Sequence, residues 1–350
     1  MPNLKIVLVG PGLIGKQHLR LLRENSEVDL MAIVAPEDEE NLRISATNRV
    51  PLFGRLEDCL KSFSPDGVII ASPNAFHFQQ ACVCIKFNVP VLIEKPITAT
   101  LDEGKALVEL AHKYNSKVLI GHHRAHSPLM KAARDLIHSG RLGRLVAIIG
   151  SAQFHKPTQY FLDGPWRTKP GGGPILINLI HEVGNLRSLI GEVDAVQAFS
   201  SSGIRGHEVE DTVSINFRFK NGVLGTFMLS DTAATPWSWE QTSQENPSYP
   251  SYSDSECYSV SGTRGSLSIP SMRLKYHPEP VEPSWWTPFE EETITVSRQD
   301  PLACQLAHFV KVIKGESLPL VSERDGYQNL LITEAVRESA NTNSIVYIRS

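Results

Sequence analysis

The feature that most constrains the fold is a glycine-rich turn that directly follows a short apolar run. Residues 4–9 read Leu-Lys-Ile-Val-Leu-Val, a pattern typical of a buried parallel strand, and Gly10-Pro11-Gly12-Leu13-Ile14-Gly15 comes next. Helical spacing then runs from Lys16 to Arg23. In such a strand–turn–helix unit the first glycine permits the turn, the second admits a pyrophosphate, and the third lets helix and strand pack closely. The turn therefore predicts a Rossmann domain that binds NAD or NADP through Gly10, Gly12, Leu13, Ile14 and Gly15.

The first third of the chain continues with alternating strand-like and helical runs. The expected strands are 28–34, 66–71, 89–93 and 117–120, and the expected helices are 75–87 and 102–114. This alternation is typical of βαβ units with right-handed crossovers. It predicts an α/β Rossmann domain with a parallel sheet over residues 1–122.

The second half has a different pattern. Longer strands are expected at 144–154, 193–200, 212–219, 222–231 and 259–269, and helices at 175–189, 303–313 and 325–340. Asn221-Gly222 is a strong hairpin signal, and residues 235–256 have little periodicity, as in a long loop. We expect an α+β domain over 123–350 with a large, mostly antiparallel open sheet, its last helices able to pack back on the first domain.

Composition excludes several classes of protein. A net charge of -4 at pH 7 argues against a nucleic-acid surface, and no apolar run approaches the roughly 20 residues of a membrane-spanning helix. The N-terminal residues do not resemble a secretory signal. Five scattered cysteines fit reduced thiols better than a disulfide framework. We therefore expect a cytoplasmic protein that acts on a small molecule and contacts neither nucleic acid nor membrane.

The residue expected to bind the ribose departs from the usual pattern. A carboxylate normally ends the second strand about 20 residues after the turn, but that position is Ala35, followed by Pro36, Glu37 and Asp38. Either one of these acidic residues binds the ribose hydroxyls, or the missing carboxylate admits the 2′-phosphate of NADP. The nearest arginine is Arg43, and the acidic cluster 37–40 should repel a phosphate. The sequence thus favours NAD over NADP.

Three further motifs carry a family resemblance. Ala71-Ser72-Pro73-Asn74-x-x-His77 follows the third strand, and Glu94-Lys95-Pro96 follows the fourth. A glycine run at 171–173 opens the long helix that ends in Asn178-Leu179-Ile180-His181. With the first turn and His18, this order resembles the glucose–fructose oxidoreductase / inositol dehydrogenase / MocA (Gfo/Idh/MocA) family over most of the chain. The resemblance implies NAD(P)-dependent oxidation or reduction of a secondary alcohol or ketone, usually in a sugar, polyol or cyclic compound, and a homodimer or homotetramer formed through the C-terminal sheet.

The resemblance also assigns roles to individual residues. Lys95 matches the family's catalytic lysine, and a lysine at the carboxyl end of a parallel strand lies where open α/β sheets bind ligands. His181 matches the family's histidine and suits proton transfer near neutral pH. The aspartate usual four residues earlier is replaced by Ile177, so either His181 acts alone or Lys95 is the main acid and base. The remaining cofactor-binding candidates are Ala35, Ser72, Pro73, Asn74, His77, Glu94, Lys95, Trp166 and Arg167.

Substrate contacts are expected from the turn after residues 117–120 and from residues around the second domain's first strand and long helix. The candidates are His123, Lys156, Tyr160 and Asn178. His122-His123-x-x-His126 has the look of a metal cluster but lacks a fourth ligand in sequence, so no metal is expected. Two other functions compete with the dehydrogenase: an NAD-retaining, redox-cycling glycoside hydrolase and a non-catalytic dinucleotide sensor.

Overall fold

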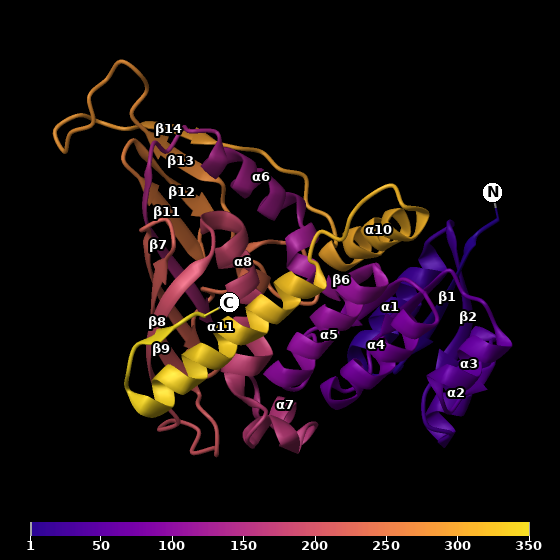
Figure 1. The fold of residues 1–350 in the computed structure, drawn as a ribbon. Coiled ribbons are helices and arrows are strands. Elements are labelled where there is room, and N and C mark those ends of the chain that lie inside the picture. Colours follow the sequence, from indigo (N-terminus) through magenta and orange to yellow (C-terminus); the bar gives the residue numbers. More distant parts are fainter. Residues whose placement is uncertain (1, 350) are drawn as a thin grey trace. The chain divides into compact units, whose positions relative to one another are not determined.

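The structure is a computed structural model that describes residues 2–349 (Figure 1). Contacts divide the chain into two compact units. Unit 1 comprises residues 2–126 with Pro301–Leu330, and unit 2 comprises Ser127–Asp300 with residues 331–349. The first break lies four residues after the boundary expected from the sequence, and residues 301–330 pack with unit 1. Within the described residues, no helix combines the length and apolar character needed to cross a membrane.

Unit 1 is built on a parallel sheet in the order β3-β2-β1-β4-β5-β6. Its strands are β1 Leu4–Val9, β2 Val28–Val34, β3 Leu52–Phe53, β4 Gly67–Ile70, β5 Val91–Glu94 and β6 Val118–Gly121. Its helices are α1 Leu13–Glu24, α2 Glu39–Asn48, α3 Leu56–Ser62, α4 His77–Lys86, α5 Leu101–Tyr114 and α10 Pro301–Lys314, with 3-10 turns at Asn74–Phe76 and His123–His126.

The strands of unit 1 are apolar because helices cover both faces of their sheet. Each residue of β4, β5 and β6 is buried. On one face, Leu19 and Leu22 of α1 join Leu306 and Phe309 of α10 in a single core cluster with the sheet. The chain continues from β1 to β2 on one side, and β4 lies on the other side of β1. This reversal of strand order creates a crevice at the carboxyl ends of β1 and β4, where doubly wound folds bind ligands.

Unit 2 contains a sheet in the order β14-β13-β12-β11-β7-β10-β9-β8-β15. Its strands are β7 Leu145–Gln153, β8 Val193–Ser201, β9 Thr212–Phe219, β10 Leu224–Ser230, β11 Tyr258–Gly262, β12 Gly265–Ile269, β13 Arg273–Tyr276, β14 Glu290–Thr293 and β15 Val346–Tyr347. Neighbouring strands pair antiparallel across the described residues, apart from β7 and β10, which are parallel. The expected α/β plus α+β architecture is confirmed.

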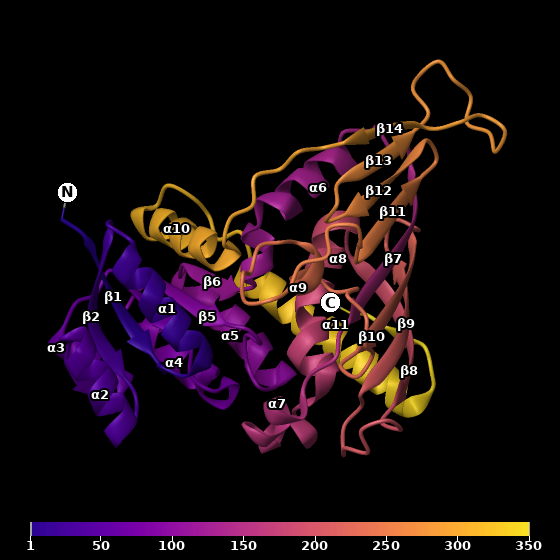
Figure 2. The ribbon, with the colours of Figure 1, turned by 180° about the vertical axis from the view of Figure 1, so that it is seen from behind.

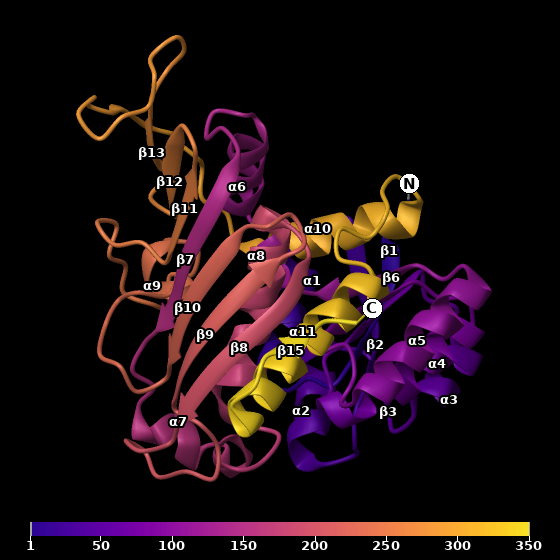
Figure 3. The same cartoon turned by 60° about the vertical axis from the view of Figure 1, so that its left-hand side comes forward.

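Helices cover one face of this second sheet and leave the other open (Figures 2 and 3). They are α6 Pro128–His138, α8 Ile180–Ile190 and the later turns of α11 Glu323–Thr342, and their apolar side chains share one core with the sheet. The shorter elements are α7 Thr158–Leu162, α9 Trp239–Thr242, a 3-10 turn at Pro165–Thr168 and a π-helix at Ile175–Leu179.

Several expectations for individual elements were wrong. The expected strand 259–269 is a hairpin, β11 and β12, joined by Thr263 and Arg264; the chain turns there because β12 folds back antiparallel on β11. Helices α2 and α3 were not expected, since their short, largely polar sequences lack a strong apolar period. The helix expected over 175–189 begins as a π-helix and becomes α-helical only at Ile180.

Candidate active site

The glycine turn has the geometry that a dinucleotide requires. Gly10 has φ +81°, and a Cβ atom there would lie 2.5 Å from Ser72 Cα, so only glycine fits. A Cβ atom on Gly15 would overlap the Gly10 carbonyl oxygen, whereas a Cβ atom on Gly12 would meet no atom within 4 Å. The turn is therefore tightly packed at Gly10 and Gly15 and open at Gly12, as a cradle for a pyrophosphate should be.

The first turn of α1 is free to bind an anion. Gly12 is its N-cap, so no side chain caps the helix, and the first turn contains no acidic residue. Its backbone N–H groups and the positive end of the helix dipole suit a phosphate. Leu13 is 80% exposed beside this turn, and Ile14 is half-buried. These residues fit the dinucleotide expected from the sequence.

His77 links the two turns that follow β4 and β5. Its Nδ1 lies 2.8 Å from the Pro96 carbonyl oxygen, and its Nε2 lies 2.8 Å from the Ser72 carbonyl oxygen. Two carbonyl acceptors favour a protonated ring, but burial opposes the charge and lowers the pKa of His77 below its usual value. The Ser72 hydroxyl donates to Gln80 at 2.6 Å, while the neighbouring Pro73 and Asn74 are exposed.

Glu94 fixes the strand that precedes Lys95. It is buried, and its Oε1 lies 2.8 Å from Nε2 of His18 on α1. Burial alone would raise the pKa of Glu94, but the hydrogen bond and charge interaction with His18 hold it below the ordinary value. Gly121 on β6 makes room for this carboxyl, because a Cβ atom there would lie 2.9 Å from it. The His18–Glu94 pair connects α1 to β5. Lys95 is half-buried at the carboxyl end of β5, and its peptide bond to Pro96 is cis.

The ribose region contains one acidic side chain that has no structural role. Ala35 is buried, and its backbone N–H pairs with the Phe53 carbonyl at 3.0 Å. Asp38 caps α2 by accepting from the Asn41 N–H at 2.8 Å, and Glu40 pairs with Lys16 at 2.6 Å. Glu37 is exposed and has no side-chain partner within residues 2–349.

Of the three histidines after β6, His123 and His126 lie in the 3-10 turn His123–His126, and His122 precedes it. The ring centroids of His126 and His308 are 5.0 Å apart. Burial, with smaller contributions from neighbouring histidines, lowers the pKa of His126 to about 3. Across the described part of the chain, no group of three or more His, Cys, Asp or Glu side chains is placed to hold a metal ion. His123 is half-buried in this turn.

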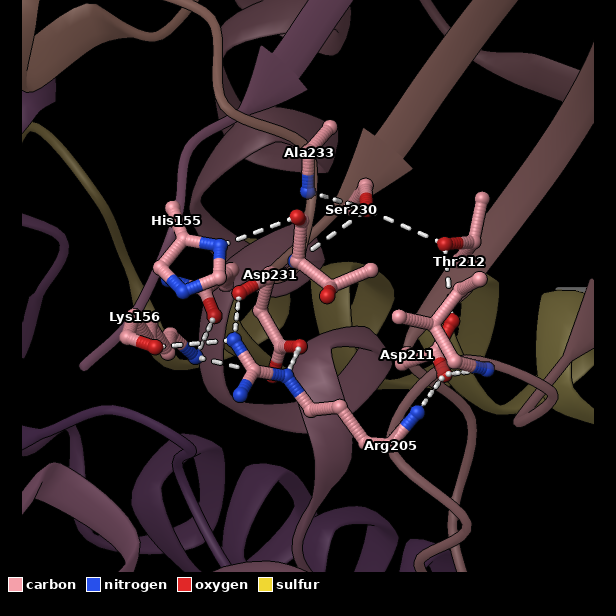
Figure 4. Close-up of polar contacts among 11 residues, drawn as sticks. His155, Lys156, Arg205, Asp211, Thr212, Ser230, Asp231 and Ala233 are labelled. Carbon is pink, nitrogen blue, oxygen red and sulfur yellow. Dashed lines mark hydrogen bonds and ion pairs between the residues drawn. The ribbon is translucent and has the colours of Figure 1, made fainter. Parts of the chain in front are cut away.

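In unit 2, two of the expected substrate residues contact each other. Lys156 is buried, and its Nζ donates to Asn178 Oδ1 at 2.6 Å and lies 3.7 Å from Asp231 Oδ2. Asp231 also accepts from Nε of Arg205 at 2.8 Å (Figure 4). This group joins the strand ends near Lys156 and Asp231 to the π-helix that carries Asn178. Sequence reasoning missed Arg205 and Asp231, which stand alone in sequence without any motif.

The Tyr160 ring contacts two cationic side chains in the same region. The Arg167 guanidinium lies 3.9 Å from its ring centroid, and Lys156 Nζ lies 4.9 Å from it. Burial raises the pKa of Tyr160, although Arg167 opposes the shift. Arg167 also donates to the Tyr160 carbonyl oxygen. Trp166 is 56% exposed, and the proposed contact of Trp166 and Arg167 with the cofactor stays a prediction.

His181 lies in the first turn of α8 and is largely buried. The helix before it is a π-helix, with i to i+5 rather than i to i+4 hydrogen bonding, so the regular α-helical spacing assumed between Ile177 and His181 does not hold. Glu210 caps this π-helix, because its Oε1 accepts from the Ile175 N–H at 2.8 Å. Burial raises the pKa of Glu210. Insertions of this kind occur frequently at functional sites.

Unit 2 also contains a pocket of about 640 Å3 beside the Lys156 group. His155, Phe161, Arg205, His207 and Thr232 contribute to its wall. The volume lies within the range of small-molecule sites. None of the four substrate candidates expected from the sequence, His123, Lys156, Tyr160 and Asn178, is among the residues that line this pocket.

Comparison with known proteins places both halves of the chain in one family. Residues 4–122 match "Oxidoreductase family, NAD-binding Rossmann fold" (Gfo/Idh/MocA), and residues 130–268 match "GFO/IDH/MocA C-terminal domain". The rhizopine catabolism protein MocA of Rhizobium meliloti is 29% identical over 55% of this chain and 59% of its own length, so the match spans less than two thirds of that relative. The 1,5-anhydro-D-fructose reductase of Ensifer adhaerens is 28% identical over 81% of this chain and 80% of its own.

A solved structure shares the fold. The WlbA dehydrogenase from Bordetella pertussis, determined with NADH and UDP-GlcNAcA, superposes with a TM-score of 0.79 over 99% of both chains. Its sequence is 21% identical to this one. At that identity, the likeness shows the fold alone.

Proposed function

Because this chain belongs to the Gfo/Idh/MocA family of NAD-binding oxidoreductases, we propose that it interconverts a secondary alcohol and its ketone in a sugar, polyol or related cyclic compound. The observation that carries the proposal is the position of Lys95. It follows β5 at the carboxyl edge of the sheet, the same edge as the glycine turn after β1, and the His18–Glu94 pair and His77 hold the backbone on either side of it.

The chemistry divides between the cofactor and the protein. When bound, the nicotinamide dinucleotide accepts or supplies the hydride. The Lys95 ammonium donates a hydrogen bond to the reacting oxygen and stabilises its negative charge as the C–H bond breaks. The hydroxyl proton passes to the neutral imidazole of His181, and the product is the ketone. Ile177 offers no carboxylate, so His181 acts without the usual aspartate.

The first test replaces Lys95. Lys95→Ala should lower kcat by at least about a hundredfold, because it removes a charged donor used in the transition state. NADH binding, followed by fluorescence, should stay within a few-fold of the wild-type value. Lys105 is a surface lysine on α5. Lys105→Ala is the matched control and should leave kcat and NADH binding unchanged. Near-normal turnover of the Lys95 variant would exclude the assigned role.

Absorbance at 340 nm separates the proposal from the two competing functions. A dehydrogenase changes the absorbance at 340 nm in proportion to the substrate converted. A redox-cycling hydrolase consumes substrate without net change, and a sensor binds the dinucleotide without turnover. Polyols, sugars and cyclic alcohols tested with NAD and NADP cover the substrate class.

Preference for NAD is part of the proposal and rests on the acidic residues after β2. Ala35→Asp places a carboxylate where the ribose is normally bound and should raise the NAD-to-NADP ratio of kcat/KM. An unchanged ratio would show that the ribose is not recognised at this position.

We also propose that the open sheet face of unit 2 forms a homo-oligomer. Ile149 on β7 and Leu224 and Met228 on β10 are exposed on adjacent strands. Contiguous exposed apolar side chains of this kind often mark an interface. Light scattering should give a dimer or tetramer, and Ile149→Lys should shift it towards the monomer; a wild-type monomer at micromolar concentration would exclude the interface.

A further inference from the structure

The pocket of unit 2 carries a fixed cation in its wall. Arg205 uses Nε to donate to Asp231 Oδ1 at 2.8 Å and Nη2 to donate to the Lys156 carbonyl oxygen at 2.8 Å and to the Asp231 carbonyl oxygen (Figure 4). Its guanidinium lies 4.5 Å from the centroid of the Phe161 ring. Within residues 2–349, Nη1 has no partner. The side chain is thus held in one orientation with the Nη1 amino group available, so little entropy is lost when it binds a ligand.

The backbone under Arg205 is fixed as well. Asp211 Oδ2 accepts from the N–H groups of Ile204 and Arg205 at 3.0 Å and 2.9 Å. Asp211 and Asp231 are both buried, and neither forms the pocket wall. Among the described residues no aspartate or glutamate does so. The two carboxylates that fix Arg205 therefore stay out of the pocket wall, which presents the guanidinium to a ligand together with neutral polar and apolar side chains.

The rest of the wall suits a compact organic molecule. His155 binds the Thr232 carbonyl oxygen through Nδ1 at 3.0 Å, so its Nε2 is the nitrogen left for other contacts. The ring centroids of His207 and Phe161 are 4.8 Å apart, and together they give an aromatic surface for a carbon skeleton. A wall that combines a prepared guanidinium, polar side chains and aromatic rings is suited to a polar molecule that carries a carboxylate.

We propose that this pocket binds the carboxylate of an acidic sugar, so that the substrate is a sugar acid rather than its neutral parent. The inference rests on the proposed function and narrows its substrate class. Few residues separate the pocket wall from the proposed catalytic histidine. His155 of the wall precedes Lys156, whose Nζ donates to Asn178, and Asn178 lies three residues before His181.

The first experiment compares acids with neutral counterparts that differ only in the carboxylate. D-Glucuronate, D-galacturonate and D-gluconate are paired with D-glucose, D-galactose and D-glucitol. Calorimetry with the full chain and NADH measures binding, and absorbance at 340 nm with NAD measures turnover. At least one acid should bind about tenfold more tightly than its neutral counterpart, in line with a charge-assisted hydrogen bond. If no acid binds more tightly than its counterpart, the proposal is overturned.

The second experiment changes charge without changing the fold. Ile204 is 77% exposed at the pocket wall, so Ile204→Glu and Ile204→Gln should both fold and differ only in charge. Ile204→Glu should weaken binding of the acid several-fold relative to Ile204→Gln, and 1 M NaCl should reduce that difference. Equal affinities of the two variants at low salt would overturn the proposal.

Substitution of the arginine gives the direct test. Arg205→Lys keeps a positive charge beside Asp231 but loses the planar fork, and it should lower the acid-to-neutral ratio of affinities about tenfold. Arg273→Lys, a surface arginine paired with Glu256 at 2.8 Å, is the matched control. An unchanged ratio in a folded Arg205 variant would contradict the proposal.

The dehydrogenase proposal and the carboxylate-pocket proposal can be refuted independently of each other. Selective binding of an acid without any change at 340 nm would retain the pocket and refute the dehydrogenase. Turnover of neutral sugars with no preference for acids would retain the dehydrogenase and refute the pocket.

Discussion

His18, His77 and His126 of unit 1 each have a different environment. His18 binds Glu94, His77 lies between two carbonyl groups, and His126 packs against the ring of His308. Nε2 of His126 is inaccessible to solvent and has no hydrogen-bond partner among residues 2–349. His126 therefore stays neutral in the folded protein at a pH where the unfolded chain is protonated.

This difference predicts acid sensitivity. The pKa of His126 is about 3 in the folded protein and near 6.5 in an unfolded chain. As pH falls from 6.5 towards 3, the unfolded state gains a proton that the folded state does not, so the free energy of unfolding decreases by up to about 1.4 kcal/mol per pH unit. Urea unfolding at pH 7.5, 6 and 5 measures this slope. His126→Gln should make it shallower, and identical slopes would contradict the assignment.

Glu37 is the residue on which cofactor choice should depend. Asp38 and Glu40 are engaged by α2 and Lys16, so Glu37 is the carboxylate left to oppose a 2′-phosphate. Removing one charge a few ångströms from a phosphate in water is worth about 1 kcal/mol. Glu37→Gln should therefore improve kcat/KM with NADP about fivefold, and Glu37→Arg should improve it further.

Its matched control is Glu39→Gln, which removes another exposed carboxylate, on α2, that lies 3.9 Å from Arg43. Equal effects of the two substitutions would show that general charge, rather than contact with the cofactor, governs the preference.

At the scale of elements, the segment 235–256 combines irregular structure with a buried anchor. Its only described helix is α9, as expected of a loop without periodicity. Glu245 nevertheless lies buried, where it accepts from the Ser127 hydroxyl and from Trp239 Nε1, the latter at 3.1 Å. One carboxylate thus ties the loop to the start of α6.

Removing this carboxylate should release the loop. Glu245→Ala leaves two buried donors without an acceptor, at a cost of about 1–3 kcal/mol in the free energy of unfolding. Trypsin or thermolysin should then cut within 235–256 more rapidly. Asp254→Ala, an exposed change in the same segment, should alter neither property. Unchanged proteolysis of the Glu245 variant would show that other contacts hold the loop.

The elements also show what sequence alone can predict. The apolar strands β1, β2, β4, β5 and β6 were predicted within about two residues at each end, because strands covered on both faces read as continuous apolar runs. The hairpin at 259–269 was missed because two short strands and a tight turn resemble one strand. The π-helix was missed because i to i+5 bonding has no distinct side-chain pattern.

The candidate site divides in the same way. The position of the glycine turn and of Lys95 at strand ends could be predicted because each follows an apolar strand, and their roles in cofactor binding and catalysis stay predictions. Arg205 and Asp231 could not, because they meet across 26 residues of sequence and neither has a local motif.

For the whole molecule, the boundary between units does not follow the order of the chain. Helix α10 packs Phe309, fully buried, into the core of unit 1, where a Cβ atom on Gly67 would lie 3.1 Å from its ring. The Rossmann sheet is therefore completed by residues nearly 200 positions beyond its last strand.

A pair of equivalent substitutions tests this division. Phe309→Ala in unit 1 and Phe227→Ala in unit 2 each remove a buried ring, and each should cost about 3–5 kcal/mol. Only Phe309→Ala should lower the urea concentration at which NADH binding is lost. Equal losses of binding in the two variants would show that the units unfold as one.

The late position of helix α10 in the chain has a consequence for protein synthesis. The chain passes between the units at residues 126, 300 and 330, so α10 of unit 1 is made after most of unit 2. A ribosome adds about 5–20 residues per second, so roughly 10–40 s pass between the synthesis of the unit 1 sheet and the synthesis of α10, which covers one of its faces. During that interval the apolar face that α10 will cover is open to chaperones and to other nascent chains. A chain that ends before residue 301 lacks α10, so the first core is unfinished and its apolar face stays uncovered.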